Sequence, residues 1–283
     1  MASLRRMTGA APGSRWEAFF ATPDPRLRNH VVGDYQGWQE WAEAPIFRPQ
    51  LPIVMVPVIL NLGPLWEIGA PDMPWGTPRA YDSFAAGLHD GIATTLSGGN
   101  AVCLQINLTP LSAHLLFRRP MAELANRTIA FEELLSAVGD ELIDRLRHAP
   151  DWEARFQIVD HFLLSQLGNR AASREISFAL QQLQRSHGSV EIGALANDLA
   201  WSRKRLIARF QTEIGLAPKT IARLCRFNRM LALLERPKDR GLAELAVIAG
   251  YYDQAHFNRD FRDFARATPG EYLAALPSRP ATH

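Results

Sequence analysis

The 283-residue chain has little cysteine and no long apolar run, and both features exclude several classes of protein. Its two cysteines, Cys103 and Cys225, are too few and too far apart to form a disulfide or zinc framework, so we expect a reducing, cytoplasmic compartment. No apolar stretch reaches the roughly 18 residues that a membrane span requires, and the first residues lack the apolar centre of a signal peptide. We therefore expect neither a membrane protein nor a secreted one.

The sequence also lacks the short motifs that carry common catalytic chemistry. It has no G-x-S-x-G turn, no H-E-x-x-H zinc motif, no G-x-x-x-x-G-K-[ST] phosphate loop and no C-x-x-C pair. Its eight histidines are scattered, and none lies four residues from another histidine or a cysteine. We therefore expect a protein that is not an enzyme and that needs no metal or cofactor.

Lysine is absent from residues 1–174, and the charge of the chain changes sign beyond them. Residues 1–174 carry 15 arginines and 18 acidic residues, a net charge of −3, whereas residues 175–283 carry 16 basic and 11 acidic residues, a net charge of +5. A basic C-terminal third favours a polyanionic partner. The overall content of 47% hydrophobic and 21% charged residues is typical of a globular protein, and the length predicts two domains.

The first half is rich in proline and in short β-branched runs. Residues 52–62 predict one or two strands with an edge or bend at Pro57. Residues 84–96 and 101–108 flank Ser97-Gly98-Gly99-Asn100, which favours a hairpin turn. We predict an antiparallel sheet or small β-barrel within residues 30–110, preceded by a disordered segment over residues 1–20.

Helical spacing begins near Pro110 and continues through the rest of this half. Apolar residues recur every three or four positions from Phe131 to Leu146, and Asp151 is placed to cap a helix that runs to Leu167. These two helices are candidates for a homodimer interface, and the alternative is that they only cover the sheet. We therefore predict an α+β domain over residues 21–167 and a linker over residues 168–174.

A helix-turn-helix pattern follows a helix predicted over residues 175–186. Residues 192–199 carry an apolar stripe in which the small Ala196 lets two helices approach closely. Ser202 is placed to cap the second helix, and Gly215 to end it. The inward side chains of the second helix are predicted to be Leu206, Phe210 and Ile214.

The pattern recurs about 50 residues later in the chain. An apolar stripe over residues 242–249 precedes the turn Gly250-Tyr251, and Asp253 is placed to cap a helix with Phe257, Phe261 and Phe264 in its core. A single helix from Pro218 to about Glu235 separates the two copies. It would span ~27 Å, which is comparable with the ~34 Å repeat of B-DNA.

Residues 175–276 carry several specific motifs. They are Leu195-Ala196, Ser202-x-x-x-Leu206-x-x-x-Phe210 with Gly215 and Pro218, then Ile248-Ala249-Gly250-Tyr251-Tyr252-Asp253-Gln254-Ala255-His256-Phe257-x-Arg259-x-Phe261, and finally Thr268-Pro269-x-Glu271-Tyr272. Through these motifs the segment resembles the DNA-binding domain of the AraC/XylS family of bacterial transcription regulators. The resemblance implies an all-α domain with two helix-turn-helix motifs joined by a linker helix, followed by a tail over residues 277–283. Ala200-Trp201 departs from the usual glycine-containing turn, and Ala208 stands where many relatives carry a polar base-reading residue.

Rotation by 100° per residue gives the outward face of each second helix. The predicted DNA contacts are Ser202, Arg203, Lys204, Arg205, Ala208 and Gln211 in the first motif, and Gln254, Ala255, His256, Asn258, Arg259 and Arg262 in the second. Arginine and lysine suit guanine, glutamine suits adenine and alanine suits the thymine methyl group. Ser202, Arg203 and Asn258 are better placed for phosphate or sugar. The alternative is that these faces are merely solvated.

Three motifs of the first half are Leu60-Asn61-Leu62-Gly63-Pro64-Leu65, Asn107-Leu108-Thr109-Pro110-Leu111-Ser112-Ala113 and Trp152-Glu153-Ala154-Arg155-Phe156. Through them, residues 30–167 resemble the sensor and dimerisation domains that often accompany this DNA-binding module. The resemblance implies a homodimer, contact with RNA polymerase, and activation rather than repression. Four tryptophans in a proline-rich stretch are candidates for binding a small-molecule effector, with ordinary packing as the alternative. They are Trp38, Trp41, Trp66 and Trp75. The alternative functions are a constitutive regulator whose first domain is only structural, and an enzyme fused to a DNA-binding domain.

Overall fold

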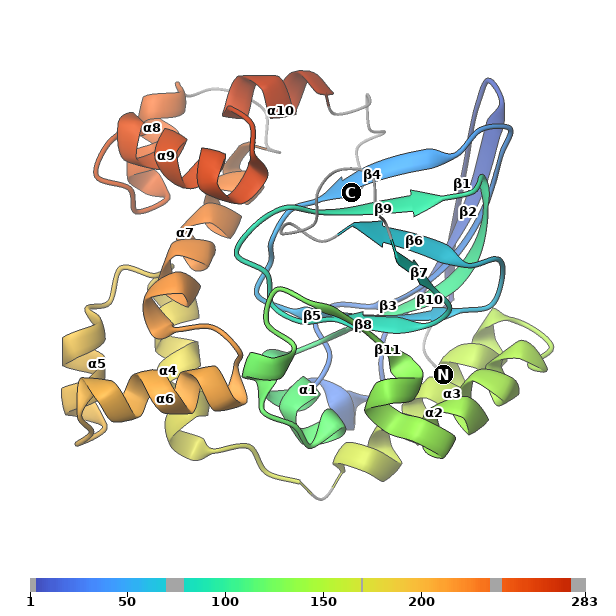
Figure 1. Cartoon of the computed structure of the whole chain (residues 1–283), viewed down its shortest axis with the longest axis horizontal. Coiled ribbons are helices and arrows are strands. Elements are labelled where there is room, and N and C mark those ends of the chain that lie inside the picture. The colour runs from blue at the N-terminus through green and yellow to red at the C-terminus, as the bar shows by residue number, and fades with distance from the viewer. Residues whose placement is uncertain (1–3, 70–78, 169, 235–240, 276–283) are drawn as a thin grey trace.

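The computed structural model describes residues 4–69, 79–168, 170–234 and 241–275, and Figure 1 shows a half made of sheets beside a helical half. Within these residues the strands are β1 (Arg5–Ala11), β2 (Ser14–Ala21), β3 (Tyr35–Ala42), β4 (Ile46–Gln50), β5 (Val56–Asn61), β6 (Trp66–Gly69), β7 (Arg79–Tyr81), β8 (Phe84–Ala86), β9 (Ala93–Ser97), β10 (Asn100–Leu108) and β11 (Thr128–Ala130). The α-helices are α1 (Pro110–Phe117), α2 (Phe131–Arg147), α3 (Trp152–Leu167), α4 (Arg174–Arg185), α5 (Ile192–Asp198), α6 (Arg203–Glu213), α7 (Pro218–Leu234), α8 (Leu242–Ile248), α9 (Gln254–Ala265) and α10 (Pro269–Ala275). Two short 3₁₀ helices are η1 (Pro25–Leu27) and η2 (Met121–Glu123).

The strands form two stacked antiparallel sheets (Figure 1). The larger has the order β1-β2-β3-β10-β5-β8-β11, and the smaller has the order β4-β9-β6-β7. The prediction of an antiparallel sheet followed by helices is confirmed, whereas the alternative of a closed barrel is not what forms. Pro57 fits within β5 because β8 pairs only with Val58 and Ile59, so the missing amide proton lies beyond that pairing.

The prediction that residues 1–20 are disordered is wrong for the described part of that segment. Residues 5–11 and 14–21 form a hairpin, β1 and β2, that turns at Gly13, whose φ of 72° favours glycine. β2 then pairs with β3 along its whole length, from Ser14 opposite Ala42 to Ala21 opposite Tyr35. This partner lies farther along the chain, which explains why local composition gave no sign of it.

The predicted hairpin across residues 97–100 is also wrong, although the strands on both sides exist. β9 ends at Ser97 and pairs with β4 and β6, while β10 starts at Asn100 and pairs with β3 and β5. The turn therefore carries the chain from the small sheet to the large one. Gly99 is required there because its φ is 99° and an added Cβ would lie 2.4 Å from the Ala42 carbonyl oxygen.

Helices α1, α2 and α3 lie on the side of the large sheet away from the small one (Figure 1). Trp152 of α3 stacks on Phe19 of β2 with ring centroids 5.0 Å apart. Gly37 of β3 makes this approach possible, because a Cβ there would lie 2.4 Å from the Trp152 ring. The inner faces of α2 and α3 therefore cover the sheet, and homodimerisation through them stays a prediction.

The predicted helices of the second half are present in the predicted order. α4, α5, α6, α7, α8 and α9 begin and end within about two residues of their predicted bounds, and α10 follows them. Among the helices that the structure describes, none is long and apolar enough to cross a membrane. The predicted tail over residues 277–283 lies outside the described residues.

Candidate nucleic-acid interface and ligand cavity

The first motif consists of α5 and α6, joined by a tight turn. Ala200 takes a φ of 52°, and the Trp201 amide donates to the Ala196 carbonyl at 2.9 Å. The Ser202 hydroxyl accepts from the Arg205 amide at 3.2 Å, which caps α6 as predicted. Phe210 of α6 and the following Ile214 are fully buried, as is Leu206. Gly215 ends the motif with a φ of 105°.

The second motif repeats this construction in α8 and α9. Gly250 takes a φ of 95°, and the Tyr251 amide donates to the Ala246 carbonyl at 3.0 Å. The Asp253 carboxylate caps α9 by accepting from the His256 amide at 2.7 Å. The predicted core of α9 is fully buried and comprises Phe257, Phe261 and Phe264. The two motifs therefore share their turn, their cap and their inward stripe.

The outward faces of α6 and α9 present most of the predicted DNA contacts to solvent. The exposed side chains are Ser202, Arg203, Lys204, Arg205, Ala208, Gln211, Ala255, Arg259 and Arg262. Gln254, His256 and Asn258 are half-buried. His256 packs edge-on against Tyr251 at 5.2 Å, and the buried Asn258 Oδ1 has no hydrogen-bond partner within the described part of the chain. These two side chains are therefore partly structural.

Two exposed arginines of the first motif have partners near the start of α6. Arg203 pairs with Glu191 at 3.4 Å, and the guanidinium of Arg205 lies 4.4 Å from the centre of the Trp201 ring. Both interactions are at the surface, where ion pairs are weak, so the guanidinium groups stay available. Both interactions hold these side chains near the start of α6.

Tyr252 is a further exposed side chain beside these faces that was not among the predicted contacts. It immediately precedes the capping Asp253 and is 88% exposed. A phenol hydroxyl at this position is a suitable donor to a phosphate oxygen, since helix N-termini commonly contact the DNA backbone. Its position one residue before a capped helix was the signal that could have found it.

The long helix α7 is tied to both motifs by arginines. Arg223 donates to Asp260 Oδ1 at 2.7 Å and to Asp263 Oδ2 at 2.5 Å, which fixes α9. Arg226 donates to the Gly188 carbonyl at 2.6 Å, in the loop before α5. Phe227 adds aromatic contacts, with its ring centroid 5.0 Å from that of Phe264. α7 therefore holds the two motifs in a defined relation (Figure 1).

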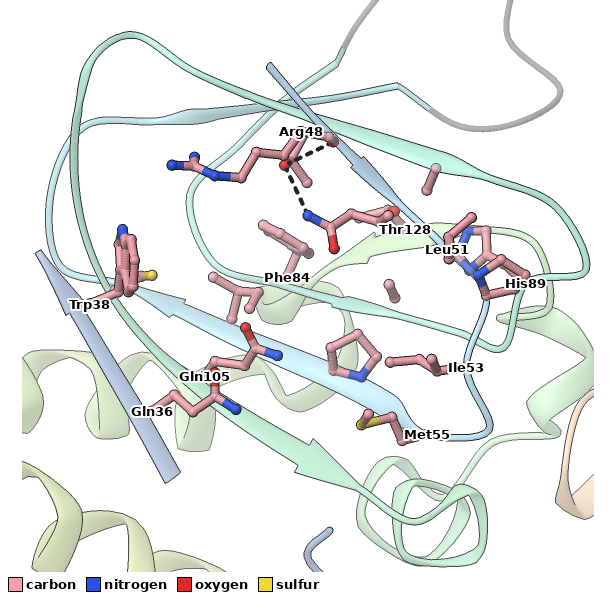
Figure 2. A pocket seen from close by; sticks show the side chains of 18 of the residues that line it. Gln36, Trp38, Arg48, Leu51, Ile53, Met55, Phe84, His89, Gln105 and Thr128 are labelled. Atoms are coloured by element: carbon pink, nitrogen blue, oxygen red, sulfur yellow. Dashed lines mark hydrogen bonds between the residues drawn. The ribbon is translucent and has the colours of Figure 1, made fainter. Parts of the chain in front are cut away.

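A cavity of about 310 Å³ lies between the two sheets (Figure 2). Its floor comes from the large sheet and its roof from the small one, and the segment 51–55 closes one side. Of the four tryptophans predicted to bind a ligand, Trp38 lines the cavity and stacks on Trp16 at 5.0 Å. Trp41 is not among the lining residues, and ligand binding by Trp41 stays a prediction. Its ring instead lies 4.7 Å from the Arg15 guanidinium.

The other two tryptophan predictions fall outside what the structure describes. This holds for the side chain of Trp66 and for the whole of Trp75. Within the described residues, no three His, Cys, Asp or Glu side chains gather as a metal site would require. Burial raises the pKa of the Cys103 thiol to about 12 and that of Cys225 to about 11, so both thiols stay protonated near neutral pH.

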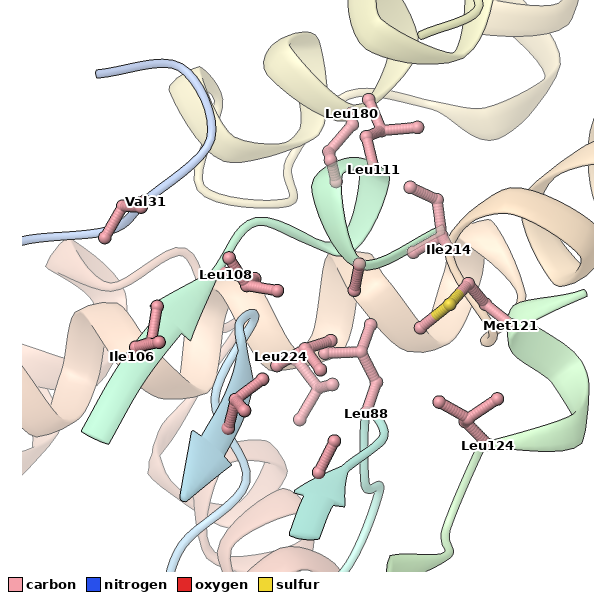
Figure 3. Packing of buried hydrophobic residues seen from close by; sticks show 14 of the residues in the cluster. Val31, Leu88, Ile106, Leu108, Leu111, Met121, Leu124, Leu180, Ile214 and Leu224 are labelled. Atoms are coloured by element: carbon pink, nitrogen blue, oxygen red, sulfur yellow. The ribbon is translucent and has the colours of Figure 1, made fainter. Parts of the chain in front are cut away.

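The two halves of the molecule share one apolar core (Figure 3). Met121 of η2 lies beside Ile214, the residue after α6, and Leu111 of α1 and Leu180 of α4 belong to the same cluster (Figure 3). A polar bridge adds to this contact. Asn228 of α7 donates to the Pro52 carbonyl at 2.8 Å and accepts from the Val54 amide at 3.3 Å. The segment that walls the cavity is therefore bonded to the helix between the motifs.

Comparison with known proteins finds a family model that matches part of the helical half and relatives among transcriptional regulators. Residues 195–275 match the family model of a helix-turn-helix domain. Over 174 residues, 61% of this chain and 56% of the relative, the sequence is 26% identical to an uncharacterized HTH-type transcriptional regulator of Haemophilus influenzae. Over 71 residues, 25% of this chain and 23% of the relative, it is 31% identical to the HTH-type transcriptional regulator MtrA of Neisseria gonorrhoeae. The matches thus span a little more than half of one relative and less than a quarter of the other.

Among solved structures, ToxT from Vibrio cholerae is similar to this chain with a TM-score of 0.49 and 10% sequence identity. The match covers 86% of this chain and 98% of that one.

Proposed function

We propose, from the AraC-type helix-turn-helix domain that the C-terminal region carries, that this protein is a transcription regulator that binds a specific duplex DNA sequence through both motifs. The observation that carries the proposal is the pair of second helices, α6 and α9, which expose Lys204, Arg205, Arg259 and Arg262 on their outward faces and are joined by one connecting helix. The 17 residues of α7 span about 25 Å at 1.5 Å per residue. That length suits two helices that enter successive major grooves on one face of the DNA.

The chemistry of the two outward faces supports a division between base and backbone contacts. Arg259 and Gln254 of α9 are proposed to contact guanine and adenine edges, and Lys204 and Arg205 of α6 to contact guanine. Ser202 and Arg203 lie at the start of α6, where phosphate contacts are common. Ala208 and Ala255 are small enough to let a base edge or thymine methyl group approach the helix.

The test begins with selection of bound sequences from a random duplex pool by the full chain. Arg259→Ala should then weaken binding to the selected site by about 1 to 3 kcal/mol and relax the preference at one base pair. Arg185→Ala, which removes the same charge from the exposed end of α4, is the control and should change affinity little. If wild type and Arg259→Ala bind the selected site with equal affinity at fixed salt, Arg259 does not contact the DNA. Failure to enrich any sequence would refute the proposal.

The proposal extends to control by a small molecule bound in the cavity between the sheets. Its support is the Asn228 bridge, because a ligand that moves the segment 51–55 also acts on α7. A ligand changes DNA affinity only by favouring one arrangement of the two halves over another. The cavity favours this function over a constitutive regulator with a solid first domain. From the family resemblance, we also propose that the protein forms a homodimer, contacts RNA polymerase and activates transcription.

A further inference from the structure

We propose that the cavity between the two sheets takes an uncharged, largely apolar ligand and rejects carboxylates and ammonium ions of the same shape. This inference rests on the proposed effector site and adds the chemical class of its ligand. A cavity of about 310 Å³ falls at the lower end of the range for small-molecule sites, which are usually apolar with a few polar groups. Its size suits a ligand of one or two rings.

Apolar side chains line most of the cavity. Trp38, Ile59 and Phe84 come from the large sheet, and Ile53 and Met55 come from the segment 51–55 (Figure 2). A ligand with an apolar body gains free energy by leaving water for these walls. Because Ile53 and Met55 belong to the segment that Asn228 holds, the same body would contact the wall connected to α7.

The charges around the cavity disfavour an ionic ligand. No acidic side chain is among the described lining residues, and the guanidinium of Arg48 forms an ion pair with Glu40, which is only 4% exposed. A ligand carboxylate beside Arg48 would therefore lie close to the buried Glu40 carboxylate and be repelled by it. A ligand ammonium group beside Glu40 would in turn lie close to the Arg48 guanidinium and be repelled by it, so neither ion finds an uncompensated partner, and an ion without a partner loses its hydration at high cost.

His89 lines the cavity as well, and its Nδ1 lies 2.6 Å from the Gly87 carbonyl oxygen. Nδ1 therefore donates to the backbone, and in the neutral imidazole the other ring nitrogen carries no proton to donate to a ligand anion. Among the described lining residues, a ligand carboxylate would therefore have to pair with the Arg48 guanidinium and displace it from Glu40.

Two neighbouring carboxamides supply hydrogen bonds that suit a neutral group. Gln36 of β3 and Gln105 of β10 are register partners, and their side chains rise from the cavity floor (Figure 2). Gln105 Nε2 donates to Asn107 Oδ1 at 2.8 Å, which fixes the orientation of its amide. A carboxamide both donates and accepts, so the pair matches a hydroxyl, carbonyl or amide of the ligand.

The experiment uses three probes of one shape, 4-phenylbenzyl alcohol, 4-phenylbenzoate and 4-phenylbenzylammonium, with the full chain at neutral pH. Calorimetric titration should show the alcohol binding about tenfold or more tightly than either ion, as expected when an ion is desolvated without a partner. Equal or tighter binding of an ion would overturn the inference, and so would no binding of any probe in the millimolar range.

Variants show whether the preference arises from the named residues. Glu40→Gln keeps the shape of the side chain and releases the Arg48 charge, so binding of 4-phenylbenzoate should strengthen toward that of the alcohol. Gln105→Leu should weaken binding of the alcohol. Gln39→Leu, the same substitution on β3 at a residue that does not line the cavity, should leave it unchanged. No gain for the benzoate in a folded Glu40→Gln variant would contradict the role given to the ion pair.

Different experimental outcomes would refute the ligand inference and the proposed DNA-binding function. A chain that binds the alcohol selectively but enriches no DNA sequence keeps the ligand inference and loses the proposed regulator. A chain that enriches a sequence but prefers an ionic probe keeps the regulator and loses this inference.

Discussion

At the scale of single residues, the two motifs differ most clearly in their turns. Ala200 has a φ of 52°, and Gly250 at the same place in the second motif has a φ of 95°. A residue with a Cβ in the left-handed region costs roughly 1 to 2 kcal/mol, whereas glycine adopts that region freely. The departure from the family pattern at Ala200-Trp201 therefore leaves local strain in the first motif without changing its fold.

Ala200→Gly should raise the free energy of unfolding by up to about 1 kcal/mol, since relief of strain exceeds the added entropy of glycine in the unfolded chain. Urea denaturation of the full chain measures the change. Ala208→Gly, at an exposed position inside α6, is the matched control and should lower stability by roughly 0.5 to 1 kcal/mol. A loss of stability in both variants would show that Ala200 is not strained.

Residues whose roles depend on near neighbours were predictable from sequence. Ser202 and Asp253 cap helices because each bonds an amide three residues ahead, and Phe261 faces inward because of helical spacing. The sequence did not show in the same way which of Trp38 and Trp41 would face the cavity. They lie three residues apart on β3, and the partner strands decide which ring faces the cavity.

At the scale of elements, helices were predicted well and strand partners poorly. The helix predicted after Asp151 as far as Leu167 is α3, because its cap and its stripe are both local. The turn at residues 97–100 has the composition of a hairpin, yet β9 and β10 join different sheets. Pairing across a sheet depends on distant residues, so local turn composition does not identify the partner.

The cap of α9 gives an element-scale prediction. Asp253→Ala removes the acceptor of the His256 amide and should lower stability by about 1 kcal/mol. Asp253→Asn retains an acceptor at the same place and should lose much less. Thermal unfolding of the full chain compares the two, and equal losses would mean that the cap contributes little.

At the scale of the whole molecule, the two halves are packed together and do not hang on a flexible linker. One buried cluster runs from Phe19 to Ala265 and includes Met121 and Ile214 at the contact between the halves (Figure 3). The length of the chain predicted two domains, but no sequence feature predicted that Asn228 would bond residues 52 and 54. Contacts separated by more than 170 residues leave no local pattern.

The Asn228 bridge gives a prediction at this scale. Asn228→Ala leaves the Val54 amide and the Pro52 carbonyl without this partner and should cost about 1 to 3 kcal/mol of stability. Hydrogen exchange should accelerate at the Val54 amide. Asn228→Asp, which keeps the acceptor for Val54 and loses the donor to Pro52, should protect that amide better than alanine does. Unchanged exchange in Asn228→Ala would show that the bridge does not form in solution.

If this bridge transmits an effect from the cavity to the DNA-contacting helices, thermodynamic reciprocity fixes the reverse effect as well. If ligand binding in the cavity changes the affinity for the operator by a given factor, operator binding changes the affinity for the ligand by the same factor. A titration of the ligand in the presence of saturating operator duplex therefore reports the same coupling free energy from the opposite direction. In a cell, promoter-bound and free copies of the protein would then respond to different concentrations of one compound.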